Sequence, residues 1–222
     1  MAILDVDLLL FQIIEQFFLE VQRDRRLIEE IFEYRTETER DMIADYLAQH
    51  SMTQDIRNAD EDNPFIYLIP SFPMMDIPLR QICIYVASEG QTDHMLGSDT
   101  GQSTVRTDVN GNRIGVDAVM GAYVHGSYII DVVSQSKEET VILNRLCYVA
   151  ILKGLEALES YGVMDTSLTI ADAMLDPQYT PIMALSRRMT FAATVLHTWN
   201  KFHPDQNYMS GNNLAISDEE TV

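Results

Sequence analysis

Residues 136–162, SKEETVILNRLCYVAILKGLEALESYG, carry the strongest helical pattern in the chain. Ser136 with Glu139 three residues later is a capping box that starts a helix, and Gly162 is suited to end it. One apolar stripe recurs at helical spacing: Leu143, Leu146, Cys147, Ala150, Gly154, Leu155 and Leu158. A second apolar flank comprises Ile142, Tyr148, Val149 and Leu152. Two flanks predict a helix covered on one side by a sheet and on the other by a second helix or another subunit.

Strand patterns lie on both sides of this helix. Before it, residues 81–86 (QICIYV) and 126–134 (GSYIIDVVS) are rich in β-branched and aromatic residues. After it come residues 165–175 (DTSLTIADAML) and 183–199 (MALSRRMTFAATVLHTW), which can pair antiparallel across a short turn. The last segment places Met189, Phe191, Ala193 and Val195 on one face. This order predicts an α+β fold, in which a mostly antiparallel sheet packs on one long helix.

A β-hairpin is predicted around residues 104–116, TVRTDVNGNRIGV. The Asn110-Gly111 dipeptide between two strand-like runs favours a two-residue type I′ turn, because both central positions need positive φ. The flanking residues are mostly polar, so we expect this hairpin to project from the body of the protein.

The N-terminal region, residues 1–62, is predicted to be helical and to act as an arm or a packed layer, with Thr38 as the N-cap of its second helix. Residues 64–80, PFIYLIPSFPMMDIPLR, contain four prolines, which predict an extended edge or loop segment and exclude a central strand. The α+β core domain is expected to span residues 63–203. Residues 204–222 are expected to form an acidic, flexible tail.

The chain is strongly acidic. Its 222 residues carry 34 Asp and Glu against 15 Lys and Arg, a formal net charge of −19, so sequence-specific DNA binding is not expected. The acidity either maintains solubility or lines a passage through which DNA slides without adhering. The same two interpretations apply to an acidic helical cluster: Glu29, Glu30, Glu33, Glu37, Glu39, Asp41 and Asp45.

The N-terminal residues do not match a signal peptide, because Asp5 and Asp7 stand where basic residues should be. No apolar run is long enough to span a bilayer, so no membrane partner is expected. Cys83 and Cys147 lie in apolar runs and are expected to be buried thiols, with a disulfide between them left open.

No catalytic or cofactor-binding motif is present, such as a phosphate-binding glycine loop, HExxH or CxxC. We therefore expect no enzyme activity, no cofactor and no metal. Two weaker alternatives remain: a metal pair at His197 and His203, and a small pocket around His94, Asp99 and His125. Arg187 and Arg188 are interpreted as surface charges, one of which could pair with another subunit.

The segment from Gly126 to Trp199 resembles the tail-terminator and tail-completion (neck) proteins of tailed bacteriophages. The resemblance rests on the strand GSYIIDVVSQ (126–135), the helix SKEETVILNRLCYVAILKGLEAL (136–158), its stop at Gly162, and RRMTFAATVLHTW (187–199). It covers about a third of the chain and lies in the order of elements rather than in an exact motif.

This resemblance implies a structural subunit that assembles with itself into a ring, usually a hexamer, at the phage head–tail junction. The implied partners are the tail tube, the neck or connector proteins and passing DNA without specific binding. The implied location is the virion, assembled in the host cytoplasm. The candidate subunit-interface residues are Ile142, Tyr148, Val149, Leu152, Asn110, Gly111 and Phe72. The alternatives are another tail or baseplate subunit, or a small ligand-binding protein or enzyme.

Overall fold

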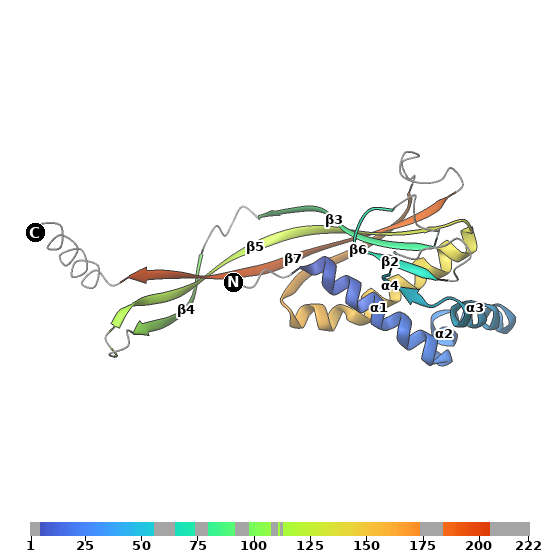
Figure 1. Ribbon diagram of the computed structural model, residues 1–222, viewed down its shortest axis with the longest axis horizontal. Helices are drawn as coiled ribbons and strands as arrows, with labels where there is room; N and C mark the ends of the chain where they lie inside the picture. The colour runs from blue at the N-terminus through green and yellow to red at the C-terminus, as the bar shows by residue number, and fades with distance from the viewer. Residues whose placement is uncertain are drawn as a thin grey trace, which may run out of the picture. The chain divides into compact units, whose positions relative to one another are not determined.

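The protein has an α+β fold, as the sequence predicted (Figure 1). The computed structural model describes residues 5–55, 65–73, 80–91, 98–107, 111, 113–173 and 184–204. The chain divides into two compact units. One comprises Asp5–Glu89 and His125–Thr194, and the other comprises Met1–Leu4, Gly90–Val124 and Val195–Val222.

The first unit begins with three helices and continues into strands. These three are α1 (Val6–Arg23), α2 (Arg25–Ile31) and α3 (Glu37–Gln49), and a further helix, α4 (Lys137–Ser160), follows later in the chain. The strands of the chain are β1 (Met52–Thr53), β2 (Ile66–Ile69), β3 (Gln81–Gln91), β4 (Ser98–Thr107), β5 (Arg113–Ser134), β6 (Val163–Ala173) and β7 (Leu185–Pro204). Strands β3, β5 and β7 contribute residues to both units.

The sheet has the strand order β1-β2-β3-β5-β7-β6. Strands β1, β2 and β3 are parallel, with Met52 opposite Ile66 and Tyr67 opposite Gln81. The rest of the sheet is mostly antiparallel, and β3, β5 and β7 alternate in direction (Figure 1). Strand β6 returns from α4 through a turn at Gly162, whose φ of +86° is the left-handed conformation that ends many helices.

Helices α1 and α4 cover one face of this sheet (Figure 1). The side chains beneath them are fully or almost fully buried: Ile82, Ile84, Ile130, Val132, Met189, Phe191 and Ala193. The alternation predicted through Met189, Phe191, Ala193 and Val195 is therefore confirmed. Helix α1 packs directly on α4, and a Cβ added to Gly154 would lie 2.6 Å from Cγ2 of Ile13. The N-terminal helices α2 and α3 pack on each other and on α1.

Two local predictions are wrong. The N-cap of α3 is Thr36 rather than Thr38, because the Thr36 side chain accepts from the Glu39 backbone while the Glu39 carboxylate accepts from the Thr36 backbone. Strand β2 is a fully buried inner strand between β1 and β3, although prolines surround it. No proline occurs from Ile66 to Ile69, so every backbone N–H of that strand remains available as a donor.

The second unit contains the predicted hairpin. Strand β4 pairs antiparallel with β5, and the four consecutive pairs from Ser103–Ala118 to Arg106–Gly115 share a midpoint between positions 110 and 111. Gly111 has a φ of +83°, which suits a type I′ turn. A register shift follows Arg106. Asn110 lies outside the described residues.

Candidate interaction site

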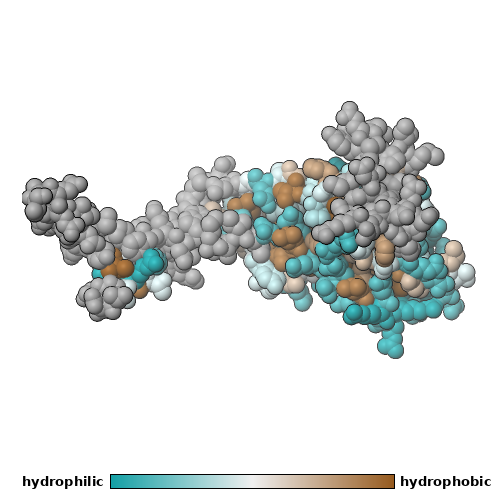
Figure 2. All heavy atoms as spheres, viewed as in Figure 1, coloured by the Kyte–Doolittle hydropathy of each residue, from teal (hydrophilic) through white to brown (hydrophobic). Residues whose placement is uncertain are grey.

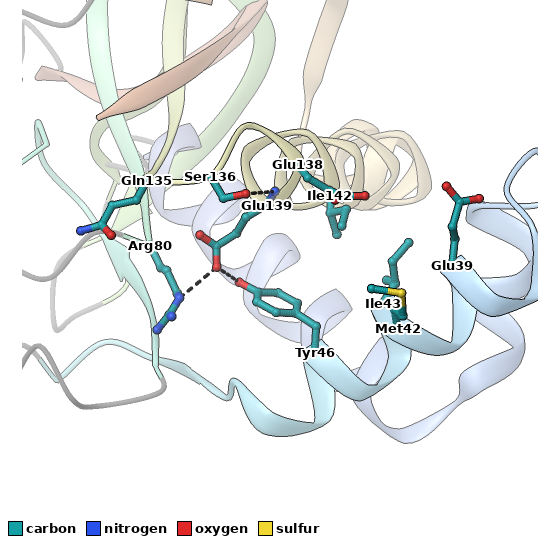
Figure 3. Close-up of a pocket in the computed structure, with 10 residues that line it drawn as sticks. All are labelled: Glu39, Met42, Ile43, Tyr46, Arg80, Gln135, Ser136, Glu138, Glu139 and Ile142. Carbon is teal, nitrogen blue, oxygen red and sulfur yellow. Dashed lines mark hydrogen bonds and ion pairs between the residues drawn. The ribbon is translucent and has the colours of Figure 1, made fainter. Parts of the chain in front are cut away.

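A cavity of about 370 Å³ lies between α3 and the start of α4 (Figure 3). Its apolar side chains are Met42, Ile43 and Ile142. Its polar lining comprises Glu39, Tyr46, Arg80, Gln135, Ser136, Glu138 and Glu139. Three carboxylates and one guanidinium give this lining a formal charge of −2. The cavity therefore combines an apolar floor with an acidic rim.

Glu139 anchors the inner end of the cavity. Its Oε1 accepts hydrogen bonds from the Tyr46 hydroxyl at 2.5 Å and from Arg80 Nε at 2.9 Å (Figure 3). Its other oxygen accepts a hydrogen bond from the Ser134 hydroxyl. Burial and the adjacent Glu139 carboxylate raise the pKa of Tyr46, so the phenol remains a neutral donor. This network ties α3, α4 and the sheet together at one point.

Arg80 reaches Glu139 from an unusual backbone conformation. Its φ is +124°, outside the regions that residues with a Cβ ordinarily occupy. The Arg80 carbonyl accepts from the Tyr67 backbone N–H at 2.8 Å, which holds the residue at the start of β3. The ion pair with Glu139 and this backbone bond are two contacts that hold the strained conformation.

The outer rim of the cavity carries two carboxylates that share one arginine. Arg35 Nη1 lies 3.0 Å from Glu138 Oε1 and 3.4 Å from Glu39 Oε1. Hydrogen bonds from the Thr36 backbone and hydroxyl, aided by Arg35, lower the pKa of Glu39. The side chain of Glu138 is 66% exposed and that of Glu39 is 44% exposed. One negative charge in excess therefore faces solvent at this rim.

A second polar network crosses the sheet. Asp131 on β5 is fully buried and accepts from the Tyr85 hydroxyl at 2.8 Å and from two nitrogens of Arg188. Burial and Asp131 raise the pKa of Tyr85. The neighbouring Arg187 pairs with Asp172 on β6 at 2.9 Å. Both arginines thus have partners within the chain, where the sequence had left a surface role or a pairing with another subunit open.

The structure also describes some of the remaining residues that the sequence singled out. Cys83 and Cys147 are free and fully buried, and burial raises the pKa of both thiols. His125 is exposed and lies 3.3 Å from the Thr194 hydroxyl, whereas His94 falls outside the described residues. Among the described side chains, no group of three or more His, Cys, Asp or Glu could hold a metal.

The candidate interface residues occupy different environments. Ile142 is buried against the cavity, and Tyr148 and Val149 are half-buried. Leu152 is 43% exposed. Phe72 is 63% exposed, although its ring lies 4.3 Å from that of Tyr85. Gly111 is exposed and Asn110 is not described.

The cavity itself was missed in the sequence, because its residues come from positions 39–46, 80 and 135–142. The one signal available was the Thr36-x-x-Glu39 capping box, which would have placed the start of α3 correctly.

No protein-family model matches this chain, and no curated protein sequence matches it. Of the helices that the structure describes, none is both long enough and apolar enough to cross a membrane.

Proposed function

We propose that this chain is a self-associating structural subunit that forms a ring at the head–tail junction of a tailed bacteriophage, as a tail-terminator or neck protein. The observation that carries this proposal is the exposed apolar surface around the second half of α4. Leu152, Tyr161 and Met164 are 43%, 60% and 38% exposed, and Tyr148, one helical turn before Leu152, is half-buried. Large apolar side chains exposed at these positions are available to pack against a neighbouring subunit.

The arrangement of elements supports the same proposal. A strand, the long helix α4 and a strand pair follow one another from Gly126 to Trp199, in the order on which the resemblance to tail-terminator proteins rests. The hairpin belongs to a compact unit separate from the one that contains the helices. A structural subunit can use the two units for different contacts.

The negative charge of the chain would determine whether DNA adheres to the lumen of such a ring. The described residues of the helical unit contain 21 Asp and Glu against 11 Lys and Arg, a formal charge of −10. The surface over α2 and α3 is largely hydrophilic, with small apolar areas between (Figure 2). A lumen lined by such a surface repels phosphates, so DNA passes through it without adhering.

Electron microscopy of the purified protein tests this function. We expect closed rings of one size, with a central opening wide enough for duplex DNA, and no retardation of duplex DNA in a gel at low salt. Open filaments, or single 25.3 kDa particles at high micromolar concentration, would overturn the ring. Tight binding of duplex DNA would overturn the non-adhesive passage.

A further inference from the structure

Among the strands that the structure describes, β6 forms one edge of the main sheet and β1 forms the other. An edge strand carries backbone N–H and C=O groups that its own sheet does not pair, and these groups are complementary to an added strand. Strand β1 has two residues, which is too short for such pairing. Strand β6 has eleven residues, Val163–Ala173, and therefore offers a full-length edge.

The middle of β6 lacks the features that usually protect an edge strand. Residues 166–171, TSLTIA, contain no charged residue and no proline. Asp165 has a positive φ of +50°, which interrupts the regular strand near its start, and Asp172 follows the stretch. The regular and uncharged part of this edge is therefore residues 166–171.

The side chains of β6 are also left largely uncovered by the chain itself. Of its eleven residues, only Val163 is buried. On the neighbouring strand β7, by contrast, Met189 and Phe191 are fully buried. Ile170 is 44% exposed and Leu168 is half-buried. A strand laid along β6 would cover this apolar surface and pair with the backbone of the edge in one contact.

We infer that β6 pairs antiparallel with β6 of a second copy, so that the two sheets become continuous across a two-fold axis. In the register that pairs all eleven residues, the central residue Leu168 lies on the axis, opposite Leu168 of the second copy. Thr166 then lies opposite Ile170 of the second copy, and the same pair recurs on the other side of the axis. Cross-strand pairs of apolar and β-branched side chains stabilise a sheet.

The charge of the chain favours this stretch as the contact between copies. With a formal net charge of −19, two copies repel each other, so they approach most easily where the contact carries no charge, as in residues 166–171. The full-length register also separates the flanking aspartates, because Asp165 lies opposite Ala171 and Asp172 lies opposite Met164. A register displaced by one residue can place Asp165 directly opposite Asp172, which is unfavourable.

This contact joins copies in pairs, and it does not depend on the proposed ring. Two-fold pairing alone gives a closed dimer, so a ring needs a further contact. If every copy uses the contact, the number of copies in any assembly is even. The six copies that the resemblance implies meet this condition.

Cysteine crosslinking tests the contact residue by residue. Directly opposed residues of an antiparallel pair have Cα atoms about 4.5–5.5 Å apart, which suits a disulfide. We expect Leu168→Cys to form a covalent dimer under mild oxidation. The native thiols, Cys83 and Cys147, are fully buried and should not react.

Two neighbouring positions show whether the pairing is antiparallel. In Thr166→Cys and in Ile170→Cys, the new thiol lies roughly 13 Å along the strand from its own counterpart, so neither variant should crosslink alone. An equimolar mixture of the two should form a mixed covalent dimer. Crosslinking of each variant with itself would instead indicate parallel pairing or random contact and would overturn the inference. Glu156→Cys, at an exposed position on α4, gives the level of random collision.

A measurement without oxidation uses added charge. Ile170→Asp places a carboxylate in the contact from each copy and should weaken association at least about tenfold in light scattering. The matched control is Val86→Asp on β3, where the apolar side chain is 39% exposed against 44% for Ile170. This control makes the same change of charge and should associate like the unmodified protein. Equal weakening by both variants would assign the effect to overall charge and contradict the inference.

The outcomes separate this pairing from the proposed ring. Covalent dimers of Leu168→Cys, with twice the monomer mass and no larger species, would uphold the pairing and overturn the ring. Rings without this crosslink, or rings with an odd number of copies, would overturn the pairing and leave the ring. A monomer at every concentration would overturn both and would leave β6 as an edge for a strand of a different protein.

Discussion

Arg188 and Asp131 form a two-pronged ion pair in the sheet. Arg188 Nε lies 2.8 Å from Asp131 Oδ1 and Nη2 lies 2.7 Å from Oδ2, while Tyr85 donates its hydroxyl to the same carboxylate. The three residues come from β7, β5 and β3, which are neighbours in the sheet. Because a shift of one residue would turn each side chain to the other face, this network specifies the register of the three strands.

The two partners of this pair should differ in their effect on stability. Asp131 is fully buried, whereas the Arg188 side chain is 35% exposed. Arg188→Met leaves the buried Asp131 carboxylate without its ion-pair partner and should lower the free energy of unfolding by about 3–5 kcal/mol. Asp131→Asn leaves Arg188 partly exposed to water and should lower the free energy of unfolding by about 1–2 kcal/mol. Urea unfolding of the two variants measures both values.

Arg187→Met is the control for this comparison. Its partner Asp172 is 83% exposed, so the loss in the free energy of unfolding should stay below about 1 kcal/mol. Equal losses for Arg188→Met and Asp131→Asn would contradict the assignment of Asp131 as the buried member.

The cap of α3 gives a second prediction. Thr36→Ala removes the side-chain acceptor for the Glu39 backbone N–H and should lower the free energy of unfolding by about 1 kcal/mol. Thr38→Ala, at an exposed position within the first turn of the helix, should change it little. The pair of variants distinguishes the observed cap from the one that the sequence suggested.

The contribution of this cap should depend on pH. The folded state lowers the pKa of Glu39 below its ordinary value of 4.5, through hydrogen bonds from Thr36. A lowered pKa stabilises the fold above the unfolded pKa, and that stability is lost as the pH falls through the folded one. The difference in the free energy of unfolding between Thr36→Ala and the unmodified protein should therefore become smaller below pH 4.5. A difference that stays constant down to the acid transition would contradict this role of Glu39.

The contact between α1 and α4 gives a third prediction. Alanine ordinarily stabilises a helix interior relative to glycine by about 0.5–1 kcal/mol. At position 154 the added Cβ would lie 2.6 Å from Ile13 Cγ2, so Gly154→Ala should instead destabilise the protein by about 1–2 kcal/mol. In the double variant with Ile13→Ala, the total loss should be smaller than the sum of the two single losses. A stabilising Gly154→Ala would show that the helices do not approach so closely.

The fold was largely predictable where the signals are local. The cap at Ser136, the stop at Gly162 and the alternation through Met189 and Phe191 each depend on residues within a few positions, and each is confirmed. Strand β2 was missed because the proline content of residues 64–80 outweighed a proline-free run of four residues.

The candidate site was not predictable, because its contacts join distant parts of the chain. Glu139 was recognised only as part of a helix cap, yet it binds Tyr46 and Arg80, which lie 93 and 59 residues away. Arg188 was interpreted as a surface charge because its partner Asp131 lies 57 residues away in the chain. Sequence spacing alone gives no signal for such pairs.

The mass of the purified protein in solution, measured by light scattering at two salt concentrations, tests the central claim most directly. The monomer mass is 25.3 kDa. We predict one discrete species at a whole-number multiple of that mass at both salt concentrations, six being the number that the resemblance implies. A mass of 25.3 kDa at every concentration and at both salt levels would contradict the account of this chain as a ring-forming subunit.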